Sequence, residues 1–186
     1  MNMKTLFLSF LVAICFLPAG ILFSQETTEV PSLPVDPDSK LIMYREVVQE
    51  QGDPSYLYNK AMEWFNYYYI NPTSIFNIQD KVNGKIEGTG RMGIFFRDDK
   101  GIQHNAGVIV YTIRLEFKEN RYRYTVTDFN LKGASRFPIE RWMNKEDPAY
   151  NPQWNNYLYQ VDTTMQRLTS TLVEKMKPVE EKKDEW

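Results

Sequence analysis

Cysteine and histidine are almost absent from this sequence, which contains one residue of each in 186. One cysteine cannot form an intramolecular disulfide, and one cysteine with one histidine cannot supply the ligands of a structural zinc site. The sequence also lacks a basic excess, because 22 lysine and arginine residues stand against 24 acidic residues. This charge balance argues against nucleic-acid binding. Aromatic residues make up 15% of the chain, which indicates a packed core rather than disorder.

Long apolar runs are absent except at the N-terminus. A short start that contains Lys4 leads into an apolar run from Leu6 to Leu17, and Ser24 offers a small residue for cleavage before Gln25. A charged start, an apolar run of this length and a small-residue site are typical of a secretory signal peptide. We therefore predict a cleaved signal peptide over residues 1–24 and a periplasmic or extracellular location for the mature protein.

Two alternatives remain open for this segment. Residues 6–23 are just long enough for an uncleaved membrane anchor, although Pro18 and Gly20 interrupt them. Cys15 could carry the lipid of a bacterial lipoprotein, but Ile14 stands where that chemistry needs a small residue. With cleavage, we expect the mature chain to have no thiol and no stable membrane span.

The rest of the chain divides into three parts. Residues 25–39 carry a proline at every third position from 31 to 37, which favours an extended linker. Hydrophobic periodicity over residues 40–177 predicts one folded domain. Residues 178–186 are mostly charged and predict a flexible tail.

Periodicity predicts the order strand, helix, four strands, helix within the domain. The first helix begins at Asp53-Pro54, which suit the cap and the first turn, and ends at Asn71-Pro72. The second helix carries an apolar stripe from Trp154 to Met176. Alternating hydrophobicity between turn signals predicts strands over residues 40–49, 75–82, 85–97, 107–118 and 121–129.

The predicted fold class is α+β, with a mostly antiparallel sheet and two helices packed on one face. One face of each long strand is apolar and the other is polar, which is typical of an antiparallel sheet covered on one side. Residues 131–152 lack a clear period, and we expect a short helix over residues 137–144. We favour a packed cover over the sheet edge for this segment and keep a functional loop as the alternative.

Four short segments of the domain carry a resemblance to a known family. They are Tyr44-Arg45-Glu46-Val47-Val48, Leu57-Tyr58-Asn59-Lys60-Ala61-Met62-Glu63-Trp64, Ile86-Glu87-Gly88-Thr89-Gly90 and Tyr111-Thr112-Ile113. From about Leu41 to Met176 the chain resembles a secreted bacterial domain of unknown function with a TBP-like fold, found mainly in Bacteroidota. The resemblance implies that fold and an extracytoplasmic location. It implies no activity, and DNA binding does not follow from the name of a fold.

Three features that suggest chemistry are better explained by structure. Residues 88–93 match G-x-G-x-x-G but lie inside a predicted strand, so we expect the glycines to make room for Trp64 or another helix aromatic. His104 follows a turn, and we expect it to be solvated rather than catalytic. Asp98 and Asp99 lack the spacing of a calcium loop and predict a hairpin turn. We assign no catalytic, cofactor-binding or metal-binding residue and no cofactor.

The outer face of the sheet is the candidate partner surface. Strand alternation turns several basic side chains away from the helices, together with Glu87 and Glu116. We favour a solvated face with cross-strand ion pairs and keep open a shallow surface for an anion or a partner. The residues assigned to this possible partner surface are Arg91, Arg114, Arg121, Arg123 and Trp142.

The sequence favours a non-catalytic binding or protein-interaction module of the cell envelope. Its expected partner is an envelope protein or a small ligand, and not a nucleic acid. The alternatives are a small-molecule carrier with a cavity between the sheet and the C-terminal helix, and a carboxylate-dependent hydrolase. A sealed aromatic interior would favour the module, a large apolar pocket the carrier, and a cleft with two facing carboxylates the hydrolase.

Export with cleavage can be tested by N-terminal sequencing. Expressed in a bacterial host with its own N-terminus, the protein should reach the periplasmic or secreted fraction and begin at Gln25. Leu22→Ala is the control, because it supplies the small residue that signal processing favours two positions before Ser24, and processing should be at least as complete. Recovery in the membrane fraction with residues 1–24 retained would contradict the prediction.

Overall fold

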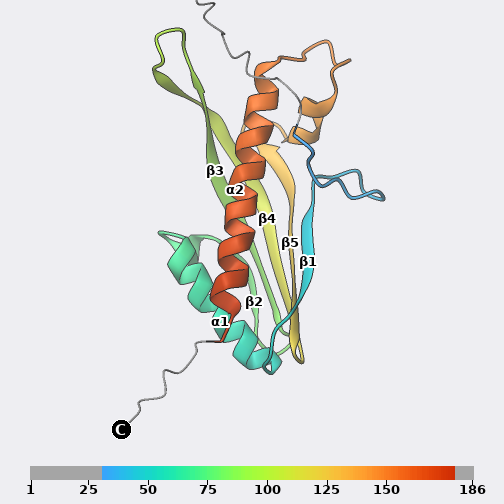
Figure 1. The fold of residues 1–186 in the computed structure, drawn as a ribbon, viewed down its shortest axis with the longest axis vertical. Coiled ribbons are helices and arrows are strands. Elements are labelled where there is room, and N and C mark those ends of the chain that lie inside the picture. The colour runs from blue at the N-terminus through green and yellow to red at the C-terminus, as the bar shows by residue number, and fades with distance from the viewer. Residues whose placement is uncertain (1–30, 179–186) are drawn as a thin grey trace, which may run out of the picture.

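A computed structural model describes residues 31–178, which form one antiparallel sheet with two helices on one face (Figure 1). The sheet has the order β1-β5-β4-β3-β2, and the short β6 pairs with β5. The strands are β1 (Tyr44–Gln49), β2 (Phe76–Asp80), β3 (Lys85–Arg97), β4 (Gln103–Lys118), β5 (Arg121–Leu131) and β6 (Phe137–Pro138). The helices are α1 (Pro54–Tyr68) and α2 (Gln153–Met176), with the 3-10 helices η1 (Pro72–Ser74) and η2 (Ile139–Met143) between them in the chain.

The predicted α+β class and the predicted order of the main elements are confirmed. Several details differ from the prediction. β1 begins at Tyr44 rather than at residue 40, because the chain still turns at Lys40, whose φ is 60°. β4 begins earlier than predicted, because the tight turn after β3 already brings Gln103 into register with Arg97. β6 was not predicted, since two residues are too short to show a period.

α1 begins at the predicted cap. The Asp53 carboxylate accepts a hydrogen bond from the backbone N–H of Tyr56 at 2.8 Å, and Pro54 takes the first helical position. The helix ends earlier than predicted, because Tyr69 is already extended while its N–H bonds to the carbonyl of Phe65.

The core lies between the sheet and the two helices. Inward-facing residues of β4 such as Ile109, Ile113 and Leu115 have no exposed surface, as their alternation predicts. The α2 residues that are equally buried are Leu158, Val161, Met165, Leu168, Leu172 and Met176. This stripe keeps α2 on the sheet over most of the length of the helix.

The glycines of β3 do make room for bulky neighbours, but the predicted neighbour is wrong. A side chain at Gly90 would overlap with the ring of Tyr111 on β4, and one at Gly88 would first meet Ile75, at 2.8 Å. Trp64 is fully buried, yet none of its atoms is among the nearest to either position. The nearest atoms belong to the neighbouring strand and to the chain before β2, rather than to a helix aromatic.

Residues 131–152 form a packed cover. β6 pairs with β5 beyond the end of β1, and η2 places Trp142 in the core with 1% of its surface exposed. The Trp142 ring lies 6.2 Å from Trp154 and 5.7 Å from Tyr157, both on α2. This aromatic cluster closes the end of the core that β1 does not reach.

The described part of the predicted linker folds back on the domain. Val35 pairs with Ile42, and Leu33 packs against the core. The Glu140 carboxylate of η2 accepts a hydrogen bond from the N–H of Ile42 at 2.9 Å. The signal peptide and nearly all of the predicted tail lie outside the described residues, so the division of the chain stays a prediction.

Gly90→Ala should destabilise the fold, because the added methyl group overlaps with the buried ring of Tyr111. The Tyr111 hydroxyl is held 3.2 Å from that of Tyr69, which opposes a swing of the ring. We expect a loss of about 1–3 kcal/mol in the free energy of unfolding, measured by chemical denaturation. Gly133→Ala is the matched control, because the nearest atom to its added carbon is 3.8 Å away. Unchanged stability of the Gly90 variant would contradict this packing.

Candidate binding site

Ion pairs across neighbouring strands neutralise much of the predicted partner surface. Arg114 on β4 lies 2.8 Å from the Glu87 carboxylate on β3. Arg123 on β5 lies 2.6 Å from that of Glu116 on β4. The two arginines remain 38% and 47% exposed, so each pair contributes about 0–1 kcal/mol. This geometry agrees with the interpretation of a solvated face with cross-strand ion pairs.

The structure does not bring the five assigned residues together. Arg121 and Arg123 line a shallow hollow of about 290 Å³ beside Lys118, near the turn between β4 and β5. Arg91 lies much further along the sheet, opposite the middle of β4. Trp142 is buried under the sheet end, so it cannot contact a partner while the core is intact.

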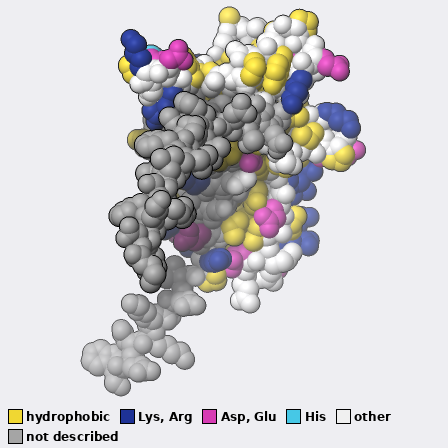
Figure 2. Space-filling model, turned by 45° about the horizontal axis from the view of Figure 1, so that its top comes forward, with side chains coloured by type: hydrophobic (Ala, Val, Ile, Leu, Met, Phe, Trp, Pro, Cys, Tyr) yellow, Lys and Arg dark blue, Asp and Glu magenta, His cyan; other side chains and the backbone are white. Residues whose placement is uncertain are grey.

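The turn between β3 and β4 is compact and polar. The Asp98 carboxylate accepts hydrogen bonds from the N–H groups of Lys100 and Ile102, both at 2.9 Å, and lies 2.9 Å from His104 Nε2. The contact with His104, followed by these backbone bonds, lowers the pKa of Asp98 below its ordinary value. His104 also stacks on Phe96, so the lone imidazole supports the turn. Figure 2 shows charged side chains of both signs gathered around the cyan histidine.

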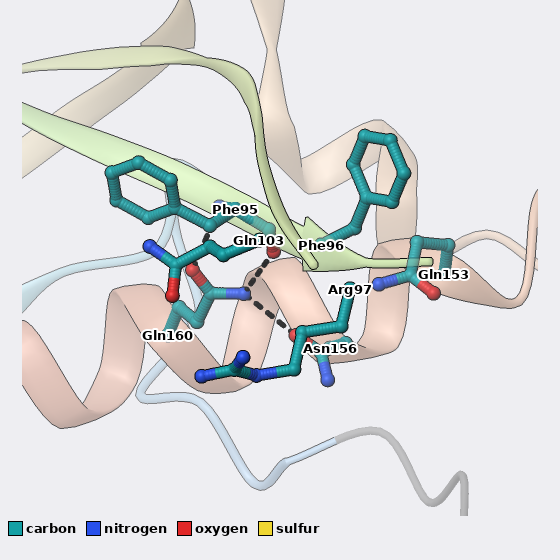
Figure 3. A pocket seen from close by; sticks show the side chains of 7 residues that line it. All are labelled: Phe95, Phe96, Arg97, Gln103, Gln153, Asn156 and Gln160. Carbon is teal, nitrogen blue, oxygen red and sulfur yellow. Dashed lines mark hydrogen bonds between the residues drawn. The ribbon is translucent and has the colours of Figure 1, made fainter. Parts of the chain in front are cut away.

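A pocket of about 370 Å³ lies where this hairpin meets the first half of α2 (Figure 3). We call this part of the domain the hairpin end, meaning the turn of residues 98–102 and the pocket beside it. The lining residues are Phe95, Phe96, Arg97, Gln103, Gln153, Asn156 and Gln160. The hairpin supplies the first four and α2 supplies the last three. Among the described residues, the lining contains amides, one guanidinium group and two aromatic rings, and no carboxylate.

Gln160 ties α2 to β3 in this pocket. Its Oε1 accepts a hydrogen bond from the N–H of Phe95 at 3.0 Å, and its Nε2 donates one to the carbonyl of Phe95 at 2.7 Å. The same Nε2 also donates to Asn156 Oδ1 at 2.6 Å, and Figure 3 marks these bonds. The N–H and C=O of Phe95 point away from β4, so the side chain of Gln160 satisfies backbone groups that no strand of the described chain pairs with.

Several lining groups are available to a ligand. Within residues 31–178, the side-chain amides of Gln103 and Gln153 make no hydrogen bond. Phe95 and Phe96 remain 37% and 36% exposed, and Ile102 in the adjacent turn is 55% exposed. Open apolar surface beside free donors and acceptors is the usual chemistry of a binding pocket.

Paired polar groups lie at the margin of the core beside α2. The Tyr44 hydroxyl donates to Asp162 of α2, and the Tyr124 hydroxyl donates to Glu46, each at 2.8 Å. Burial, with the hydrogen bond to Glu46 as the next cause, raises the pKa of Tyr124 to about 12. These phenols therefore stay neutral and anchor the strands to the helix and to each other.

Two further findings concern only the part of the chain that the structure describes. No group of three or more His, Cys, Asp and Glu side chains is arranged there to hold a metal ion. No helix there is both long and apolar enough to cross a membrane.

Residues 44–132 match the family described as a domain of unknown function (DUF4468) with TBP-like fold. The chain contains a DUF4468 domain. The match begins with β1 and ends just after β5, so η2 and α2 lie beyond it.

Two solved structures are similar to this chain. One is a DUF4468 family protein from Bacteroides ovatus ATCC 8483, with a TM-score of 0.54, 15% identity, and coverage of 77% of this chain and 91% of that one. The other is a TBP-like protein from Parabacteroides distasonis ATCC 8503, with a TM-score of 0.50, 14% identity, and coverage of 72% and 93%. They confirm the predicted TBP-like fold, and at these identities they establish nothing else. No protein among those with curated descriptions matches the chain significantly.

Sequence reasoning missed the pocket, which the DUF4468 domain shares with α2. Two signals pointed to it. Phe95 and Phe96 are adjacent in an alternating strand, so one of the two rings must leave the core. Gln153, Asn156 and Gln160 recur at intervals of three and four residues, which places three amides on one face of α2.

Gln160→Ala should expose the backbone of Phe95, because the side chain that satisfies it is removed. We expect hydrogen exchange of the Phe95 amide to accelerate by at least about tenfold, with a loss of about 0.5–1.5 kcal/mol in the free energy of unfolding. Residue-resolved NMR measures this exchange.

Gln166→Ala is the matched control, because the Gln166 amide bonds to Asp162 within the same helix. It should leave exchange at Phe95 unchanged. If the Phe95 amide exchanged as slowly in the Gln160 variant as in the wild type, the hydrogen bonds of Gln160 would not protect it.

Proposed function

We propose that this DUF4468 domain is a non-catalytic binding module that acts outside the cytoplasm, and that its ligand surface is the pocket at the hairpin end. The chemistry of the lining carries the proposal. Amides, a guanidinium group and aromatic rings bind ligands through hydrogen bonds and stacking. They offer no group that exchanges a proton near neutral pH, so they do not support acid–base catalysis.

The packing of the interior supports this function over a carrier. A carrier needs a cavity between the sheet and α2, but residues such as Leu158 and Met165 of α2 and Leu115 of β4 have no exposed surface in that space. The hydrolase alternative has no support on the outer face, because Glu87 and Glu116 are bonded to arginines there. Export rests on the predicted signal peptide alone.

A photo-crosslinking residue in place of Gln103 tests the proposed site in the protein expressed in its native host. We expect a covalent adduct with the ligand on irradiation, because Gln103 lines the pocket. The same residue at Val82 is the control, since Val82 is 97% exposed and lies in the β2–β3 turn, at the far end of β3 from the pocket. No adduct at Gln103, or equal adducts at both positions, would overturn the proposed site.

A further inference from the structure

Among the described strands, most of β3 has a neighbour on one side only. β4 pairs with it from Lys85 to Arg97, whereas β2 pairs with it only as far as Gly88. The last contact on that side is the hydrogen bond from the N–H of Thr89 to the carbonyl of Ile75, at 2.8 Å. Beyond it, no strand of the described chain covers this edge, and in Figure 1 β3 forms the margin of the sheet above β2.

Arg91 and Gly93 present the open backbone groups of this edge. In an antiparallel sheet the N–H and C=O of one residue point to the same side, and the side alternates along the strand. The backbone groups of Thr89 and Phe95 point away from β4. The N–H of Thr89 bonds to the chain before β2, and the N–H of Phe95 bonds to Gln160. Arg91 and Gly93 lie two and four residues after Thr89, so their backbone groups also point away from β4. Within residues 31–178, their edge-facing groups have no hydrogen-bond partner.

The Gln160 side chain occupies the position that a peptide group would take in an added strand. A strand paired with Phe95 would accept a hydrogen bond from its N–H and donate one to its carbonyl. Gln160 makes both bonds, at 3.0 and 2.7 Å. A primary amide carries the same kinds of donor and acceptor as a peptide group. The edge of β3 therefore already binds the chemical group that a peptide backbone would bring.

Two arginines flank the open edge. Strand alternation places the side chain of Arg91 on the outer face, whereas Arg97, at the end of β3, lines the pocket beside Asn156 of α2 (Figure 3). Among the described residues, neither arginine has a carboxylate partner, and Arg97 bonds only to the carbonyl of Gly101, at 2.9 Å. The arginines nearer the other end of the same face are paired with glutamates. A ligand of this edge is therefore favoured if it carries negative charge.

We infer that the edge of β3 from Arg91 to Arg97 binds an extended acidic peptide segment of a partner protein, which adds to the sheet as a further strand. The inference rests on the proposed function, because it assigns a ligand class to the hairpin end. The peptide backbone pairs with Arg91 and Gly93, then displaces the Gln160 amide and pairs with Phe95. Backbone bonds supply the affinity, and carboxylates opposite the two arginines supply the preference.

A synthetic peptide tests this inference on the purified protein. The probe is acetyl-Glu-Thr-Val-Thr-Tyr-Thr-Glu-amide, whose glutamates face Arg91 and Arg97 in either strand direction. Calorimetry at low ionic strength should detect saturable binding. Exchanging both glutamates for lysines should weaken binding by at least about tenfold. Backbone N-methylation of the probe at Val and Tyr removes the hydrogen bonds that an antiparallel strand would donate to β3. N-methylation at the threonines removes those that a parallel strand would donate. One of these two modified peptides should therefore fail to bind.

Protein variants test the same edge from the other side. Arg91→Glu combined with Arg97→Glu should weaken binding of the probe by at least about tenfold. The matched control is Lys118→Glu combined with Arg121→Glu, near the β4–β5 turn, and its affinity should stay within about twofold of wild type. Gln160→Ala should tighten binding by about threefold to tenfold, because the peptide no longer has to displace its amide.

The peptide and variant experiments have other possible outcomes, and each of these would overturn the inference. Binding that survives both patterns of N-methylation would exclude strand addition. Equal weakening by the two charge-reversed pairs would show attraction by charge without a site. Self-association that protects the edge, with no binding of the probe, would assign the edge to a second copy of the chain. If the probe fails while the Gln103 adduct forms, the inference is wrong and the proposed function stands. If that adduct is also missing, the proposed function is wrong.

Discussion

Burial of one sheet face beneath α2 is the constraint on which the rest of the structure depends. β4 and β5 present apolar side chains that must leave water, and the stripe of α2 from Leu158 to Met176 covers them. α1 lies on the same face beside α2, near the end of the sheet that carries β2 (Figure 1). Because β2 stops early, the outermost strand beyond it is β3, and its edge at the hairpin end is open.

The two edges of the sheet are protected unequally. Exposed edges invite pairing with other chains, and proteins usually cover or charge them. β6 takes up the edge of β5 where β1 stops. Within residues 31–178, the open part of β3 is guarded only by the Gln160 amide at Phe95 and by the charge of Arg91 and Arg97. The Gln160 amide and the two arginines disfavour pairing with neutral or basic strands, and they favour an acidic strand. The same residues therefore protect the edge from most strands and select its ligand.

Periodicity predicted the elements because burial itself imposes it. The inward residues of β4 and the stripe of α2 follow directly from alternation and from the helical repeat. The pocket could not be predicted in this way, because Gln160 and Phe95 are 65 residues apart and meet only where α2 crosses β3. Strand alternation identified Arg91 and Arg114 as outer-face residues. Only the register shows that Arg114 faces Glu87 while Arg91 faces Val110. Tyr111 fills the space at Gly90 because its ring leans over that residue. The direction in which a ring leans has no periodic signal in the sequence.

Amide hydrogen exchange at Arg91 and Gly93 tests the central claim, an open β3 edge that accepts a strand, most directly. In the free protein, residue-resolved NMR should show fast exchange at these two amides and slow exchange at Met92 and Ile94, which face β4. Adding the acidic peptide should slow exchange at Arg91 and Gly93 selectively. Exchange at Arg91 and Gly93 in the free protein as slow as at Met92 and Ile94 would mean that the edge is already covered, and would contradict the account.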